Sequence, residues 1–178
     1  MIKKIQDYIM CFENSIDPKL CKKIITKSYN QTFVPALSGG GERNSSRNCY
    51  ESPLDVEFQN EIFKVVGQSI QNYQEAHPNF ITGLTTEDTG YGHLLYMGAE
   101  KGEYKEHVDN YDLHQRVLSM SLILNDDYDG GDFAFFEGQH IVKKQRGSVV
   151  AFPSNFCFPH AITPVSNGDR HAIITWIH

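Results

Sequence analysis

The stretch RVLSMSLILNDDYDGGDFAFFE, residues 116–137, holds two short runs of β-forming residues separated by the turn residues Asp129-Gly130-Gly131. Runs of this length, bounded by aspartate and glycine, are typical of strands joined by turns. The pattern continues on both sides. Many short strands without alternating helices favour a double-stranded β-helix, or jelly roll, over a parallel α/β fold. The expected strands are 92–98, 117–124, 132–137, 148–152, 158–163 and 171–177.

The first half of the chain has a different pattern. Residues 4–14 suggest a first strand, and Asp17-Pro18 supplies an N-cap followed by proline at the first helical position, which predicts a helix to about residue 29. Apolar residues at helical spacing predict a second helix over about 56–76. We expect a mostly β fold in which these helices pack on one outer face of the jelly roll.

The length and apolar content fit one domain over residues 1–178. The chain has 178 residues, of which 40% are hydrophobic, enough for one good core. We expect residues 1–90, approximately, to supply helical support and a lid loop, and residues 91–178 to form the jelly-roll core.

The lid loop is expected at Ser38 to Tyr50, which contains three consecutive glycines. Glycines lose much conformational entropy when they are fixed, so we expect this segment to be mobile and to order over a substrate. Arg47 is its expected substrate contact. The alternative is an ordinary solvated loop.

Charge, hydropathy and cysteine content disfavour some partners and indicate a cellular location. The formal net charge of −6 gives no basic stripe, which disfavours nucleic acid. No apolar run approaches the roughly 20 residues that span a bilayer. The four cysteines have no CxxC spacing, and the chain opens without an apolar signal segment. We therefore expect reduced cysteines and a cytoplasmic location.

Two histidines and an aspartate are candidate metal ligands. His107 and Asp109 are two residues apart, so on a strand they project from one face and can share one ion. His160, about fifty residues later, reaches that ion only if the sheet folds back, as it does in a jelly roll. Two histidines and one carboxylate leave three positions open on a metal, as a non-haem Fe(II) oxygenase requires. The alternatives are a surface His107 and a core His160 without metal.

Arg170 completes the pattern. A turn at 166–169 precedes it, and we expect Arg170 on a strand next to the one that bears His160, pointing into the barrel. A buried arginine needs an anion, and a carboxylate matches its two parallel donors. The alternative is an internal salt bridge to an acidic residue.

The segments around these residues resemble the prolyl 4-hydroxylase branch of the Fe(II)/2-oxoglutarate-dependent oxygenases. The resemblance covers about residues 90–178. It is carried by Tyr96, by Gly102-Glu103-Tyr104-Lys105-Glu106-His107-Val108-Asp109, by Arg116-Val117-Leu118-Ser119 with Leu124-Asn125, by Asp129-Gly130-Gly131-Asp132-Phe133, by Pro159-His160 with Thr163-Pro164-Val165, by Gly168-Asp169-Arg170, and by Trp176.

The resemblance implies a role for each residue of the site. His107, Asp109 and His160 would hold Fe(II), and Arg170 would pair with the distal carboxylate of 2-oxoglutarate. Tyr96 matches a tyrosine that hydrogen-bonds this cosubstrate in the family.

Two serines are further residues of the expected cosubstrate pocket, and one isoleucine stands where the family has a residue of that pocket. Ser119 and Ser121 share one strand face and should lie near 2-oxoglutarate. Ile123 departs from the pattern, because many relatives have there a tyrosine that assists the arginine. Tyr96, Ser121 or a water would then replace that contact.

Tyr104 and Trp176 are further candidates for substrate contacts, with solvent exposure and a packing role as the respective alternatives. The other histidines, at 93, 114, 140, 171 and 178, are not expected to be ligands, although His93 lies nearest the site strand. Specificity is expected to depend on the loops 38–50 and 110–116.

The implied activity is hydroxylation of an unactivated C–H, with O₂ and 2-oxoglutarate as cosubstrates, succinate and CO₂ as products, and ascorbate as reductant. The expected substrate is a prolyl residue in a peptide or protein. The alternatives are a free amino acid or small metabolite, a nucleic-acid dealkylation, and a cupin-like metal-binding module without catalysis.

Overall fold

The computed structural model describes residues 3–38, 45–79, 87–110 and 115–178. Two α-helices, two short 3-10 helices and fourteen strands lie in these ranges. In chain order they are η1 (Ile5–Tyr8), β1 (Met10–Phe12), α1 (Pro18–Ser28), β2 (Val34–Pro35), β3 (Arg47–Asn48), β4 (Tyr50–Pro53), α2 (Val56–Ala76), β5 (Gly92–Tyr96), η2 (Gly98–Glu100), β6 (Glu103–His107), β7 (Leu118–Ile123), β8 (Asp129–Gly130), β9 (Phe133–Phe135), β10 (His140–Val142), β11 (Val149–Pro153), β12 (His160–Ile162), β13 (Val165–Ser166) and β14 (Arg170–Ile177).

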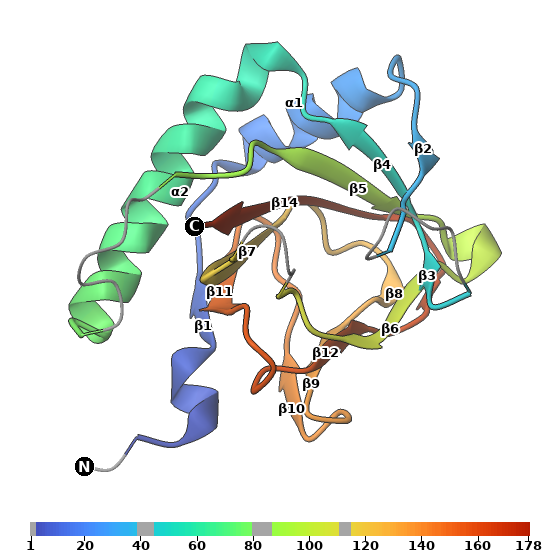
Figure 1. Ribbon diagram of the computed structural model, residues 1–178. Helices are drawn as coiled ribbons and strands as arrows, with labels where there is room; N and C mark the ends of the chain where they lie inside the picture. Colours follow the sequence, from blue (N-terminus) through green and yellow to red (C-terminus); the bar gives the residue numbers. More distant parts are fainter. Residues whose placement is uncertain (1–2, 39–44, 80–86, 111–114) are drawn as a thin grey trace.

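The strands form two main antiparallel sheets, as expected for a jelly roll. One has seven strands in the order β1-β11-β7-β14-β5-β4-β2, and the other has five in the order β10-β9-β12-β6-β3. Figure 1 shows the five-stranded sheet below the seven-stranded one. The strands β13 and β8 pair separately at one end. The mostly β fold expected from the sequence is confirmed.

The strand β14 shows how the sequence determines the two faces of the larger sheet. Successive side chains of a strand point to opposite faces. Arg170, Ile174 and Trp176 line a cavity between the sheets, whereas Ile173 and Ile177 pack in the apolar cluster under the helices. Burial on both faces explains why this strand reads as a nearly continuous apolar run.

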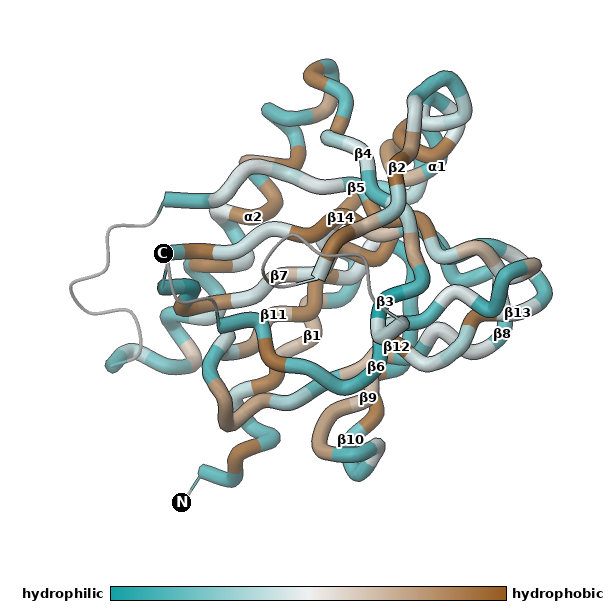
Figure 2. The backbone as a smooth tube through the Cα atoms, turned by 45° about the vertical axis from the view of Figure 1, so that its right-hand side comes forward, coloured by the Kyte–Doolittle hydropathy of each residue, from teal (hydrophilic) through white to brown (hydrophobic). Residues whose placement is uncertain are grey.

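The two helices cover the outer face of the seven-stranded sheet, on the side away from the five-stranded one (Figure 1). Each begins at an aspartate cap, because the Asp17 and Asp55 carboxylates accept from the amides of Lys19 and Glu57 at 2.8 and 3.0 Å. Both helices agree with their predicted ranges. Along α2 the buried residues recur at helical spacing, and Figure 2 shows the corresponding alternation of hydrophilic and hydrophobic residues. Neither described helix combines the length and apolarity needed to cross a membrane.

Several N-terminal expectations need correction. The predicted first strand over 4–14 is a 3-10 turn followed by the three-residue β1. The sheets also do not divide near residue 90, because β1, β2 and β4 belong to the larger sheet and β3 to the smaller one. Propensity alone does not show these pairings, since strands of two to four residues gain their order from neighbours far along the chain.

The segment predicted as a lid, Ser38 to Tyr50, overlaps two of these N-terminal strands, β3 and β4. Its residues 47–48 pair with β6 and its last residue, Tyr50, begins β4. The glycine run of the expected lid falls in 39–44, outside the described residues.

Gly130, the last residue of β8, and Gly131 form the turn that leads the chain toward β9 in the five-stranded sheet. Both glycines have φ of +63°. A Cβ at Gly130 would lie 2.0 Å from the Pro164 carbonyl O, and one at Gly131 would lie 2.6 Å from the Tyr128 ring. The chain can make this approach only without side chains.

We expect Gly130→Ala to destabilise the protein by about 1–3 kcal/mol, because alanine combines an unfavourable φ with a backbone clash. The melting temperature should fall by roughly 2–4 °C per kcal/mol for a chain of this size. Gly67→Ala is the matched control, since nothing lies within 4 Å of the added Cβ on α2, and there we expect a gain of about 0.5–1 kcal/mol. Equal shifts of the two variants in a thermal denaturation series would contradict this account of the turn.

Candidate active site

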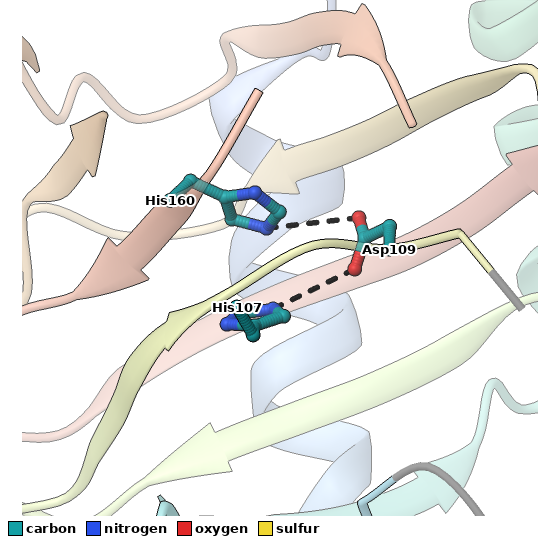
Figure 3. A group of neighbouring side chains, drawn as sticks. All are labelled: His107, Asp109 and His160. Carbon is teal, nitrogen blue, oxygen red and sulfur yellow. Dashed lines mark ion pairs between the residues drawn. The ribbon is translucent and has the colours of Figure 1, made fainter. Parts of the chain in front are cut away.

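The three predicted metal ligands come together at one end of the five-stranded sheet. The strand β6 ends at His107, β12 begins at His160, and the two histidines are register partners. Asp109 lies two residues beyond the end of β6, so it is not on the same strand as His107, contrary to expectation. Figure 3 shows both rings turned toward the carboxylate.

The distances are those of a ligand set. His107 Nε2 lies 3.5 Å from Asp109 Oδ1, and His160 Nε2 lies 3.6 Å from Asp109 Oδ2. One ligand atom from each of the three residues lies within 4.8 Å of the others. Within the part of the chain that the structure describes, this is the one group of three or more potential ligands.

Backbone carbonyl groups orient both histidine rings. The Nδ1 atoms of His107 and His160 lie 2.8 and 3.0 Å from the carbonyl oxygens of Lys105 and Phe158. A carbonyl oxygen accepts only, so each Nδ1 must carry the proton. The Nε2 lone pairs are therefore left for a metal, the arrangement that outer-shell partners commonly impose on metal-binding histidines.

The charges suit a cation. Burial alone would raise the pKa of the Asp109 carboxyl, but His160, His107 and a hydrogen bond from Ser119 together lower it below its usual value. Burial lowers the pKa of His160 to about 4, although Asp109 opposes this. At neutral pH the site therefore offers an anionic carboxylate and a neutral imidazole, the forms that bind metal.

This donor set fits Fe(II). Imidazole nitrogens with one carboxylate form the facial triad of non-haem Fe(II) oxygenases, and three coordination positions are left for other ligands. A closed structural zinc site would use four protein ligands.

Arg170 lies on the opposite sheet from His160. Its strand β14 pairs with β5 and β7 in the seven-stranded sheet, whereas β12 pairs with β6 and β9. The expectation of neighbouring strands was wrong, because the chain crosses between the sheets through β13 and its turn. The side chain still points into the space between the sheets, where it lines the same cavity of about 270 Å³ as the triad.

The guanidinium of Arg170 is buried without an anion. The residue is 2% exposed, its Cζ lies 4.9 Å from the centre of the Tyr96 ring, and its Nε has no hydrogen-bond partner. Among the described residues, no carboxylate lies within ion-pair distance of it, which argues against the internal salt bridge. A buried cation without a counter-ion is costly. The cavity therefore fits a small dicarboxylate such as 2-oxoglutarate, bound between the triad and Arg170.

Tyr128 is a residue that the sequence reasoning missed. Ile123, where relatives have tyrosine, is buried in the apolar core. Tyr128, five residues later, lies beside Arg170, because a Cβ at Gly131 would touch both the Tyr128 ring and Arg170 Cδ. Burial raises the pKa of the Tyr128 phenol, and the Arg170 cation, together with a hydrogen bond to Arg170, opposes this shift. The only available signal was an aromatic residue just before the glycine pair.

The residues expected near 2-oxoglutarate have different positions. Tyr96 and Ser121 line the cavity, and the Tyr96 hydroxyl is hydrogen-bonded to the Cys49 thiol. Ser119 instead contacts the Asp109 carboxylate and lies 2.8 Å from Ser154 Oγ. Ser119 thus orients Asp109, a predicted metal ligand, and is not among the residues that line the cavity.

The three residues expected at the substrate all line the cavity. Tyr104 stacks on the His107 ring with centroids 3.5 Å apart, and Arg47 Cζ lies over the Tyr104 ring, 5.0 Å from its centroid. Trp176 lies under Arg116, whose Cζ is 3.6 Å from the indole ring. Arg116 also lines the cavity. It belongs to the loop 110–116 on which specificity was expected to depend, but it was not singled out as a site residue, because a loop position has no periodic pattern that would place its side chain.

The remaining described histidines lie outside the triad. His93 on β5 and His171 on the neighbouring β14 form a buried pair, with His93 Nε2 3.0 Å from His171 Nδ1. His140 and His178 are partly exposed. His114 lies outside the described residues.

The buried His93 makes folding sensitive to acid. Burial, and to a lesser extent His171, lowers the pKa of His93 to about 3 from 6.5. Between these values the unfolded chain binds a proton that the folded chain does not, so stability falls as pH decreases from about 6.5 toward 3, by up to about 1.4 kcal/mol per pH unit. Urea denaturation of metal-free protein at several pH values should show this slope. It should be smaller in His93→Gln and unchanged in the control His140→Gln; an identical slope in both variants would contradict the assignment.

The comparisons with known proteins agree with this geometry. Residues 92–178 match the model of the 2OG-Fe(II) oxygenase superfamily. A PKHD-type hydroxylase of Psychrobacter sp. (strain PRwf-1) is 35% identical over 168 residues, which cover 86% of this chain and 61% of that protein. The chain thus spans about three fifths of the length of this relative.

Solved structures share the fold at low sequence identity. A prolyl hydroxylase from Trichoplax adhaerens, in complex with a hypoxia inducible factor peptide, has a TM-score of 0.76 at 16% identity, over 96% of this chain and 83% of that one. A viral collagen prolyl hydroxylase from Paramecium Bursaria Chlorella virus-1, in complex with 2-oxoglutarate, has a TM-score of 0.75 at 16% identity, over 96% and 95%. Residues 92–178 thus carry the match to the 2OG-Fe(II) oxygenase superfamily, and the triad, the buried arginine and the jelly-roll fold agree with it.

Proposed function

We propose that this protein is an Fe(II)- and 2-oxoglutarate-dependent dioxygenase that hydroxylates a prolyl residue in a peptide or protein. The observation that carries the proposal is the buried, unpaired Arg170 in the same cavity as His107, Asp109 and His160. This combination provides for both a metal and an anionic cosubstrate.

When bound, Fe(II) and 2-oxoglutarate supply oxidising power from O₂, giving succinate, CO₂ and a hydroxyl group on an unactivated C–H. The protein's own residues bind and orient. His107, Asp109 and His160 would hold the metal, Arg170 would receive the distal carboxylate, and Ser119 fixes the Asp109 carboxylate by a hydrogen bond. Tyr96 and Ser121 lie on the cavity wall, where their hydroxyl groups can orient the cosubstrate.

The prolyl substrate is supported by the family branch. The relative from Psychrobacter is named a PKHD-type hydroxylase, and the structural neighbours are prolyl hydroxylases, one of them with a peptide. A free amino acid or small metabolite is the second candidate, because the cavity of about 270 Å³ is also large enough for one. A nucleic-acid substrate is disfavoured by the net charge of −6, and a purely structural metal module would leave Arg170 unexplained.

Two accessory features complete the proposal. Ascorbate would serve as reductant, as the family resemblance implies. A reducing compartment such as the cytoplasm is supported by the four cysteines, all of which are free thiols.

The test is mass spectrometry of proline-containing peptides after incubation with the protein, Fe(II), 2-oxoglutarate and ascorbate. We expect a gain of one oxygen atom on proline, lost when 2-oxoglutarate is omitted or proline is replaced by alanine. Succinate formation without any oxidised peptide, but with an oxidised free amino acid, would favour the second candidate.

A further inference from the structure

The cavity wall carries more positive charge than the proposed chemistry uses. The two charges of a ferrous ion and the one of Arg170 balance Asp109 and the two carboxylates of 2-oxoglutarate. The Arg47 guanidinium also lines the cavity, while Asp109 is the one carboxylate among the described lining residues. The wall therefore favours a further anion.

Arg47 is held firmly at this wall. It pairs in register with Tyr104, its Cζ lies over the Tyr104 ring at 5.0 Å, and Nη1 donates to the Leu37 carbonyl. Its Nη2 lies 3.6 Å from Glu51 Oε2, but that carboxylate is 40% exposed, and exposed ion pairs are weak. The Arg47 side chain itself is 11% exposed and contacts the Cys49 thiol, a weak acceptor, and its Nε has no other hydrogen-bond partner.

Arg47 is also close to the metal ligands. Tyr104, which it covers, stacks on the His107 ring at 3.5 Å with an interplanar angle of 16°. A group bound by Arg47 would thus lie one aromatic layer from the triad.

Trp176 adds a second buried donor at the same cavity. Its Nε1 has no hydrogen-bond partner, and the Arg116 guanidinium lies on its ring, with Arg116 Nη1 3.2 Å from the carbonyl O of Asp109. The Trp176 indole nitrogen and Arg47 Nε donate only, and buried donors without acceptors in a cavity call for a ligand that accepts.

We propose that the substrate presents a carboxylate next to the carbon that is hydroxylated, and that Arg47 binds this carboxylate. The inference rests on the proposed function and specifies its substrate class. A carboxylate suits a guanidinium because it accepts two parallel hydrogen bonds. A nucleic-acid phosphate would supply a similar anion, but a polyanion is repelled by a chain of net charge −6. The carboxylate could be an acidic side chain beside a peptidyl proline or the α-carboxylate of a free amino acid.

The experiment uses Trp176 as a reporter, since it is the single tryptophan of the chain and lines the cavity. Its fluorescence is followed without O₂, in the presence of Fe(II) and 2-oxoglutarate, so that binding is measured separately from turnover. Two matched pairs of probes are titrated. One is a capped peptide with aspartyl-proline against the same peptide with asparaginyl-proline, and the other is N-acetyl-proline against its amide.

We expect the carboxylate member to bind at least about tenfold tighter in the aspartyl pair. Arg47→Gln should remove this difference, whereas Glu51→Gln, which leaves Arg47 without its exposed partner, should keep or increase it. Lys64→Gln, the same charge change on the exposed surface of α2, should have no effect. Should Arg47→Gln not fold, Arg47→Lys keeps the charge without the forked donor and should lose most of the preference.

The outcomes separate the two proposals. A preference confined to N-acetyl-proline would support the carboxylate site and identify the α-carboxylate as its source. Equal affinities within both pairs, absence of any fluorescence response to the carboxylates, or a preference that survives Arg47→Gln would overturn the inference. A carboxylate preference in the titrations, combined with no oxidation of any prolyl probe in the mass-spectrometric assay with O₂, would leave the inference standing and contradict the prolyl substrate.

Discussion

Replacing Asp109 by alanine is expected to abolish stoichiometric Fe(II) binding and, with it, all turnover of 2-oxoglutarate. Asp109 lies between both histidine Nε2 atoms at 3.5 and 3.6 Å and supplies the single negative charge of the ligand set. Substituting an outer-shell partner of a metal site already costs about 10–100-fold in affinity, so loss of a direct ligand should weaken Fe(II) binding by more than about a hundredfold.

The effect on metal can be separated from an effect on folding. In the parent protein, Fe(II) at a hundredfold excess over its dissociation constant should stabilise the fold by about 2.7 kcal/mol. Thermal denaturation with and without Fe(II), under anaerobic conditions, should show this gain in the parent and in the control His140→Ala, but not in Asp109→Ala. A double variant lacking both His107 and Asp109 that still bound one ion per chain would place the metal elsewhere.

The site was predictable from sequence where local spacing reflects three-dimensional proximity. His107 and Asp109 are two residues apart, so almost any extended backbone brings them near each other. His160 was predicted from the family resemblance of the segment around it rather than from local spacing, and antiparallel pairing of β12 with β6 makes it the register partner of His107. The two helices were likewise predictable, since an aspartate cap and apolar periodicity act within a few residues.

What the sequence did not reveal depends on contacts between distant segments. The short turn before Arg170 suggested a neighbouring strand, but the chain crosses to the other sheet, and the choice of sheet depends on the pairing of β14 with β5 and β7. Tyr128 and Arg116 reach the site through tertiary packing, beside Arg170 and on the Trp176 ring. The strand β3, which contains Arg47, has two residues, and its backbone pairing in the sheet is with β6.

Arg170→Ala is expected to raise the 2-oxoglutarate concentration needed for half-maximal turnover by about 10- to 100-fold while changing Fe(II) affinity little. Hydrogen bonds to charged groups contribute about 1.5–3 kcal/mol, and each 1.4 kcal/mol corresponds to about tenfold in affinity. The separation is possible because Arg170 lies on the seven-stranded sheet, whereas His107 and His160 belong to the five-stranded one and Asp109 follows β6. Arg170→Lys should fall between the parent and alanine, since lysine keeps the charge but not the paired donors.

The measurement combines Fe(II) binding with succinate formation over a range of 2-oxoglutarate concentrations. Arg146→Ala is the matched control, because that arginine is 41% exposed and pairs with Asp126 outside the cavity. Removing Arg170 also removes a buried cation whose Nε has no hydrogen-bond partner and which has no counter-ion among the described residues. We therefore expect Arg170→Ala to fold without 2-oxoglutarate, because it leaves no buried charge unpaired. If its 2-oxoglutarate dependence matched that of Arg146→Ala, Arg170 would not be the carboxylate receptor. The buried guanidinium would then require another anion, and Tyr128, which lies beside it, would be the first residue to substitute.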